Sequence, residues 1–250
     1  MKILVTGGAG YIGSILIGLL LKDYEVFVLD KFQKLNPSLA AYCSNDNFHP
    51  LVGDVRDEKI LKEIVSKVDL VIPLAALVGA PLCKLDPITA QSVNFDAIKT
   101  LVKLLSKDQK IIYPTTNSGY GIQEKDEFCD ENSPLNPISL YGKSKCDSEK
   151  LILDSGNGIT FRLATVFGMS PQMRLDLIVN DFVYRALFDN ALIIFEGSFR
   201  RNFIHIKDVA RAFVHAIKNY DSMNNEAFNV GLSSANLTKI ELCEEIKKHI

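Results

Sequence analysis

A glycine-rich segment near the N-terminus constrains the fold of this chain most. Residues 2–6 (KILVT) form a short apolar, β-branched run, typical of a strand buried on both faces of a parallel sheet. GGAGYIG follows at 7–13, and residues 12–22 are apolar enough for a buried helix. This order lets the backbone approach a pyrophosphate, which free N–H groups and the positive helix end then bind. The alternative is an ordinary tight turn between a strand and a helix.

Acidic residues after the next two predicted strands favour a dinucleotide. Asp30 ends the segment EVFVLD, where a carboxylate accepts hydrogen bonds from both ribose hydroxyls of NAD and repels the extra phosphate of NADP. Lys31 stands next to it and can soften that preference. Asp54, in GDVRD at 53–57, either reaches the adenine amino group or caps the following helix. The sequence therefore predicts NAD as cofactor and leaves both roles of Asp54 open.

Short apolar strands alternate with helical segments over the first two thirds of the chain. Strands are expected at 2–6, 25–30, 48–52, 69–74, 110–114 and 158–163, and helices at 12–22, 57–67, 88–106 and 141–153. Repeated strand–helix–strand units with right-handed crossovers give an α/β fold, a doubly wound parallel sheet of the Rossmann type.

The pattern changes after residue 168. Fewer strands (192–195, 203–206, 226–230) and more amphipathic helices (175–189, 207–219, 238–249) predict a smaller, interwoven α/β substrate lobe. We therefore expect an NAD-binding domain at 1–168 and a substrate-binding lobe at 169–250. The last predicted helix has no C-cap glycine or following proline, so we expect a further C-terminal segment.

Composition excludes several classes of protein. The chain has 250 residues, and its formal net charge of -2 argues against nucleic acid or an anionic membrane as a partner. Its five cysteines and four histidines are scattered, which indicates reduced thiols and no metal site. No apolar run reaches the roughly 18 residues of a membrane helix. A cytoplasmic location is expected.

A tyrosine and a lysine at helical spacing suggest the chemistry. Tyr141 and Lys145 share one helix face, so the Lys145 ammonium is expected to lower the pKa of Tyr141 and make it a general base. Thr116 follows the strand 110–114 and can hydrogen-bond the reacting oxygen. A surface helix pair and a turn-stabilising threonine are the respective structural alternatives.

With these motifs in place, the chain resembles extended short-chain dehydrogenases/reductases of the NAD-dependent epimerase/dehydratase family. Further segments in the family's order carry the resemblance: PLAALVG (73–79), SVNFDAIKTL (92–101), TTNSGYG (115–121), NPISLYGKSK (136–145), FRLATVFG (161–168) and RRNFIHIKDVARA (200–212). The resemblance implies a catalytic tetrad of Asn94, Thr116, Tyr141 and Lys145, with Asn94 acting through Lys145 and water.

The resemblance also implies the binding residues. The cofactor would be held by Tyr141, Lys145 and the residues Gly7, Gly10, Tyr11, Ile12, Gly13, Asp30, Asp54, Val55, Leu74, Ala75, Ala76 and Leu163. The substrate, a nucleotide-diphosphate sugar, would meet Asn117, Ser118, Thr165 and Arg201, with Arg201 on the diphosphate. The family further implies a homodimer or higher homo-oligomer, paired through helices 88–106 and 141–154. Their apolar residues include Val93, Ile98, Leu101, Leu104, Leu105, Leu151, Ile152 and Leu153.

The implied reaction is oxidation at C4 of the sugar through a 4-keto intermediate, ending as an epimerase or as a net dehydrogenase. Dehydratases of the family carry Asp-Glu where this chain has Asn117 and Ser118, so 4,6-dehydration is not expected. PLAALVGAPLC and TTNSGYGIQEKD resemble dehydrogenase-like members that act on GDP-heptoses in surface-polysaccharide pathways. Two alternatives remain open: a non-catalytic NAD-sensing protein and a reductase of small carbonyl compounds.

Overall fold

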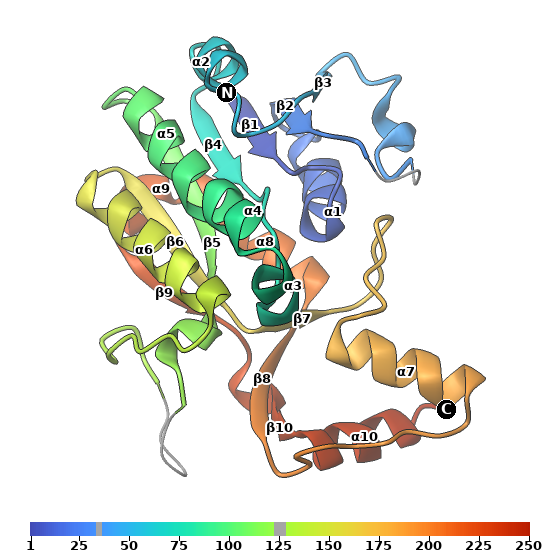
Figure 1. Ribbon diagram of the computed structural model, residues 1–250. Helices are drawn as coiled ribbons and strands as arrows, with labels where there is room; N and C mark the ends of the chain where they lie inside the picture. Colours follow the sequence, from blue (N-terminus) through green and yellow to red (C-terminus); the bar gives the residue numbers. More distant parts are fainter. Residues whose placement is uncertain (34–36, 123–128) are drawn as a thin grey trace.

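The computed structural model describes residues 1–33, 37–122 and 129–250, and its centre is a parallel sheet of seven strands (Figure 1). The strand order is β3-β2-β1-β4-β5-β6-β9, and every neighbouring pair is parallel. The strands are β1 (Lys2–Thr6), β2 (Glu25–Asp30), β3 (Phe48–Val52), β4 (Leu70–Pro73), β5 (Lys110–Thr116), β6 (Gly158–Leu163) and β9 (Ala227–Val230). The predicted Rossmann-type α/β fold is confirmed.

Helices cover both faces of this sheet. In β1 the side chains alternate: Ile3 and Val5 pack towards α1 (Tyr11–Leu20) and α8 (Ile206–Lys218), and Leu4 faces the opposite side. That opposite layer contains α2 (Glu58–Val65), α5 (Ala97–Leu104) and α6 (Leu140–Asp154). The inner strands β1, β4, β5 and β6 are covered on both faces and are therefore buried and apolar along most of their length, which made them predictable. The edge strand β3 leaves Val52 exposed.

The predicted helix at 88–106 is continuous but changes its winding. It consists of α4 (Pro87–Gln91), the π-helical turn η2 (Ser92–Asp96) and α5. Asn94 lies in the π-helical turn and is buried. Turns of this kind occur frequently at functional sites because they redirect side chains that a regular helix would misplace.

A second, smaller sheet lies with two helices at one end of the molecule (Figure 1). Its strands are β7 (Thr165–Phe167), β8 (Arg200–His205) and β10 (Asn236–Thr238). Residues of α7 (Ile178–Phe188) and α10 (Lys239–Lys247) form a third core cluster with Phe203. Between β8 and β10 the chain returns to the first sheet, since α8 packs on α1 and β9 pairs with β6. The division into 1–168 and 169–250 stays a prediction.

Three local predictions are corrected. The strand expected at 192–195 does not form: this segment has no partner strand in the described residues, and Ile193 and Phe195 are exposed. Helix α3 (Ala80–Leu85), with Pro81 in its first turn, was not among the predicted helices, and it buries Cys83. The three-residue strands β7 and β10 were not predicted. Residues 123–126 of TTNSGYGIQEKD lie outside the described residues.

The apolar residues expected at a dimer interface also need correction. Four of them are buried within the single chain, in the core beneath or beside the central sheet: Val93, Ile98, Leu101 and Ile152. Side chains already in the core cannot form an intermolecular contact. The oligomeric state itself stays a prediction.

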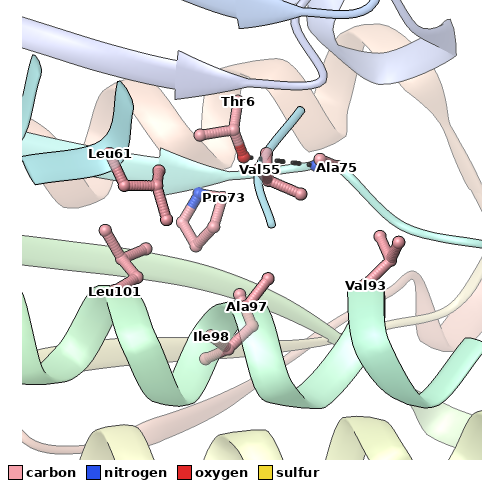
Figure 2. Close-up of a pocket in the computed structure, with 9 residues that line it drawn as sticks. All are labelled: Thr6, Val55, Leu61, Pro73, Ala75, Val93, Ala97, Ile98 and Leu101. Atoms are coloured by element: carbon pink, nitrogen blue, oxygen red, sulfur yellow. Dashed lines mark hydrogen bonds between the residues drawn. The ribbon is translucent and has the colours of Figure 1, made fainter. Parts of the chain in front are cut away.

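Leu101 generates a first test of this packing. Its side chain, from α5, lines a small apolar cavity beneath β4 together with Leu61 and Ile98 (Figure 2). Leu101→Ala would enlarge that cavity in a site that is 2% exposed, so we expect a loss of about 2–5 kcal/mol of unfolding free energy. Urea unfolding measures it. The control is exposed Lys103→Ala on the same helix, and an equal effect of both substitutions would contradict this packing.

Candidate active site

One large pocket, of about 900 Å³, lies at the carboxyl ends of the central strands. Ligands of doubly wound sheets bind at this edge. The pocket is lined by these predicted site residues: Gly7, Gly10, Tyr11, Ile12, Gly13, Asp30, Asp54, Val55, Leu74, Ala75, Ala76, Thr116, Asn117, Ser118, Tyr141, Lys145, Leu163, Thr165 and Arg201. Asn94 is the predicted site residue that does not line it. The fold therefore brings the remaining residues together.

The glycine turn needs glycine for close packing. A Cβ on Gly7 would lie 2.6 Å from the backbone nitrogen of Ala75, and Gly7 adopts a φ of +69°. A Cβ on Gly13 would lie 2.5 Å from the carbonyl oxygen of Gly8. Gly10 is the N-cap residue of α1, so the helix begins at the pocket wall. The turn thus presents the positive end of α1 to an anion.

Asp30 is held beside this turn. Its Oδ2 accepts a hydrogen bond from the Ala9 N–H at 3.0 Å, and its Oδ1 accepts one from the Phe32 N–H at 2.9 Å. These contacts fix the carboxylate at the end of β2, where the pocket passes from the glycine turn to Asp54. This position fits a carboxylate that accepts hydrogen bonds from ribose hydroxyls.

The structure rules out one of the two roles considered for Asp54, and contact with the adenine stays a prediction. The N-cap of α2 is Asp57, whose side chain accepts from the N–H groups of Lys59 and Ile60, so the capping role of Asp54 is wrong. Asp54 instead binds the Arg56 guanidinium and lies 2.8 Å from the Lys31 ammonium. These two cations, Arg56 first, hold the pKa of Asp54 well below its usual range. Lys31 is therefore engaged in an ion pair.

The predicted catalytic residues stand on two neighbouring elements. Helix α6 begins at Ser139, which caps it, and carries Tyr141 and Lys145 into the pocket. The Lys145 ammonium donates to the Pro114 carbonyl at 3.0 Å and lies 4.3 Å from the Tyr113 ring centre. Thr116 ends β5, and its hydroxyl caps the short helix η3 (Asn117–Tyr120) while facing the pocket. Thr116 thus stabilises a turn and lines the pocket.

Burial controls the ionisation of this pair. It raises the pKa of Tyr141 above the usual value for tyrosine, and it lowers the pKa of Lys145 to about 7. The prediction that Lys145 brings the pKa of Tyr141 down is wrong for the protein alone. The physical reason is that a water-poor site disfavours both the phenolate and the ammonium.

The Asn94 side chain is hydrogen-bonded to the backbone of the loop after β4. Its side chain accepts from the Leu77 N–H at 2.8 Å and donates to the Leu77 carbonyl at 2.9 Å, which fixes the pocket-lining loop after β4. Its own carbonyl accepts a hydrogen bond from the Ser148 hydroxyl of α6 at 2.9 Å. The side chain therefore contacts Leu77, and a link to Lys145 stays a prediction.

Sequence reasoning missed a second arginine of the pocket. Arg174 lines it, and its guanidinium binds Asp176. Asn180 of α7 holds the Arg174 carbonyl and also donates to the Tyr11 hydroxyl, which joins the glycine turn to this loop. No motif singled out Arg174, because its approach to the pocket depends on α7.

Within 1–33, 37–122 and 129–250, no group of three or more His, Cys, Asp or Glu side chains is placed to hold a metal ion. In the same part of the chain, no helix combines the length and apolar character that crossing a membrane requires.

The fold, glycine turn, Asp30 and the Tyr141–Lys145 helix together define a dinucleotide-binding α/β protein of the short-chain dehydrogenase/reductase class. The chain belongs to the NAD dependent epimerase/dehydratase family, whose model matches residues 3–231. The predicted family and its cofactor, NAD, are confirmed. The N-terminus of α1, which no side chain caps, and the carboxylate of Asp30 fit that cofactor.

Known proteins are similar over nearly the whole chain. The UDP-glucose 4-epimerase of Halalkalibacterium halodurans is 31% identical, covering 100% of this chain and 81% of that protein. The mouse dTDP-D-glucose 4,6-dehydratase is 27% identical, covering 98% and 72% respectively. The UDP-glucuronic acid 4-epimerase of Bacillus cereus, solved with UDP-glucuronic acid and NAD, has a TM-score of 0.88 at 28% identity, covering 99% of this chain and 82% of that one.

The Lys31–Asp54 pair predicts how cofactor preference can be changed. Asp54→Asn would leave the charge of Lys31 uncompensated beside Asp30, which favours a ribose phosphate. We expect the ratio of NADP to NAD affinity to rise on the order of tenfold, a change of about 1.4 kcal/mol. Calorimetric titration with both cofactors measures it, and adding Lys31→Ala should reverse the effect. An unchanged ratio in Asp54→Asn would contradict the role of this ion pair.

The low pKa of Lys145 predicts a pH-dependent stability. Between its folded pKa of about 7 and the unfolded value near 10.4, the unfolded state binds more protons, so stability rises with pH. Below this window both states carry the proton and the full cost of burying the charge is present. Urea unfolding at several pH values should show this rise in the wild type and a smaller rise in Lys145→Met. Identical pH slopes would show that Lys145 titrates normally.

Proposed function

We propose that this protein oxidises C4 of a nucleotide-diphosphate sugar with NAD and passes through a 4-keto intermediate. The observation that carries the proposal is the single pocket that joins the glycine turn to Thr116, Tyr141 and Lys145. Arg201 of β8 lines the same pocket from the second sheet, as a diphosphate ligand requires.

Each residue then has a defined role. Tyr141 takes the proton of the sugar 4-hydroxyl, Thr116 hydrogen-bonds that oxygen, and Lys145 binds the nicotinamide ribose. NAD, when bound, would supply the hydride acceptor for C4, and its positive ring would favour the Tyr141 phenolate, which burial alone disfavours. Leu163 lines the nicotinamide side, and Thr165 and Arg201 contact the substrate. The same Tyr141 returns the proton when the ketone is reduced.

The fate of the ketone separates the members of this family. Asn117 and Ser118 line the pocket beside Thr116, and neither side chain is an acid or base near neutral pH. We therefore propose epimerisation or net dehydrogenation and no loss of water, although relatives include dehydratases. Within this proposal, a GDP-heptose 4-dehydrogenase of surface-polysaccharide biosynthesis is the alternative. A homodimer and a cytoplasmic location belong to the same proposal.

Tyr141→Phe tests the mechanism. Removing the hydroxyl removes the proton acceptor, so we expect kcat to fall by about 10²–10⁴-fold while NAD still binds. Turnover is followed by NADH absorbance and by NMR of the sugar, across UDP-, GDP-, CDP- and dTDP-sugars that include heptoses. Tyr184→Phe, at a half-exposed position on α7, is the matched control. Turnover near that of the wild type in Tyr141→Phe would refute the mechanism.

The same spectra distinguish the products. Stoichiometric NADH with a keto sugar identifies a dehydrogenase, and an inverted C4 without NADH identifies an epimerase. Loss of the C6 hydroxyl would overturn the argument from Asn117 and Ser118. NAD binding with no change in any sugar would favour the non-catalytic NAD-sensing alternative.

A further inference from the structure

A buried ion pair lies directly behind the proposed catalytic residues. Glu149 of α6 and Arg162 of β6 are 3% and 7% exposed. The Arg162 Nε and Nη2 donate to Glu149 Oε1 at 3.0 and 2.7 Å, and the Thr115 hydroxyl donates to Oε2 at 3.0 Å. Both oxygens of this carboxylate therefore have donors.

Arg162 is itself held on its other side. Its Nη1 donates to the Tyr120 hydroxyl at 2.9 Å and to the Glu131 carbonyl at 3.0 Å. The guanidinium thus joins β6, α6 and η3, the elements that carry Leu163, Tyr141 and Ser118. Buried ion pairs seldom add stability over apolar side chains of the same volume, so this one calls for another explanation.

Lys145 stands one helical turn before Glu149. At this spacing a lysine and a glutamate lie within reach of each other, and burial strengthens the attraction between opposite charges. The Lys145 ammonium nevertheless donates to the Pro114 carbonyl, and no described carboxylate oxygen lies within 4.0 Å of it. Two buried, opposite charges on one helix face therefore remain unpaired with each other.

Other titratable groups near α6 do not supply a negative charge. Burial raises the pKa of the Cys83 thiol and of the Tyr113, Tyr120 and Tyr141 hydroxyls, so all four are neutral at neutral pH. Helices α3, α4 and α5 and the turn η2 also pack against α6. Helix α4 has no charged residue, and the charged side chains of the other three are exposed: Lys84, Asp96, Lys99 and Lys103. Glu149 is thus the carboxylate among these groups that Lys145 can reach without unfolding.

We propose that Arg162 is a positioning residue that occupies the Glu149 carboxylate and so keeps Lys145 unpaired and facing the pocket. Without the guanidinium, Glu149 would be a buried charge with no cation, and the flexible Lys145 side chain would turn to it. An ion pair with Glu149 would fix the ammonium in its charged form and withdraw it from the cofactor site. The inference rests on the role of Lys145 in the proposed function.

The test measures the protonation of Lys145 directly. Limited acylation with acetic anhydride, read for the Lys145 peptide by mass spectrometry over a pH series, needs no sugar. In the wild type the labelling should follow a pKa of about 7. In Arg162→Met the new ion pair should raise that pKa by more than two units, so labelling at neutral pH falls on the order of 100-fold. Wild-type labelling in Arg162→Met would overturn the proposal.

A double variant separates charge from packing. Arg162→Met with Glu149→Gln removes both charges, so Lys145 labelling should return to the wild-type rate. Labelling that stays slow in the double variant would overturn the proposal, because Glu149 would then not be the partner. Arg185→Met, which breaks a surface pair with Asp181, is the matched control and should label like the wild type.

A third variant covers the case in which Arg162→Met does not fold. Arg162→Lys keeps the charge but loses the two-pronged contact, so labelling should fall part of the way, and no fall would overturn the proposal. The proposed function and this inference can be refuted independently of each other. A wild type inactive on every nucleotide sugar but with the expected labelling refutes only the proposed function. A Tyr141-dependent enzyme with unchanged Arg162→Met labelling refutes only this inference.

Discussion

The close approach of the glycine turn to the end of β4 is the contact on which the rest of the site depends. A single methyl group at Gly7 would meet the backbone of Ala75 at 2.6 Å, so only glycine lets the first turn and the β4 loop share one wall. That wall sets where α1 begins and hence where its positive end points. It also sets where the loop fixed by Asn94 runs, and so joins the cofactor end of the pocket to the catalytic end.

Some charged side chains in and behind this pocket form ion pairs, and others are kept out of them. At the ribose end Asp54 pairs with Lys31 and Arg56, and Asp30 is hydrogen-bonded only to backbone N–H groups. Behind the catalytic end Glu149 pairs with Arg162, and Lys145 donates to a backbone carbonyl. In a water-poor site an unpaired lysine loses its proton easily, and a tyrosine keeps its own. At neutral pH Tyr141 is therefore uncharged, and Lys145, with a pKa of about 7, is charged in about half of the molecules.

The sequence predicted the elements whose pattern follows directly from burial. Strands β1, β4, β5 and β6 are apolar because helices cover both their faces, and the glycine turn is visible because no other residue fits it. The segment 192–195 has the same apolar pattern, yet Ile193 and Phe195 are exposed, since no strand among the described residues pairs with it. Strands β7 and β10 have three residues each, too few for a period-two pattern to emerge.

The sequence predicts the site residues that belong to a family motif. It does not predict the residues whose positions depend on contacts with distant parts of the chain. Tyr141, Lys145 and Thr116 were predicted from spacing, and the pocket contains all three. Arg174, Glu149 and Arg162 owe their positions to contacts across elements far apart in the chain, which no local pattern encodes. The raised pKa of Tyr141 was missed for the same reason, because burial depends on the assembled fold.

The central claim is that this pocket moves a hydride from C4 of a nucleotide-bound sugar to NAD. The most direct measurement uses nucleotide sugars deuterated at C4, incubated with the protein and NAD, followed by mass spectrometry of the cofactor. The account predicts deuterium on the nicotinamide ring with one of the sugars. Cofactor that binds but stays unlabelled across the whole panel, with the protein folded, would contradict it.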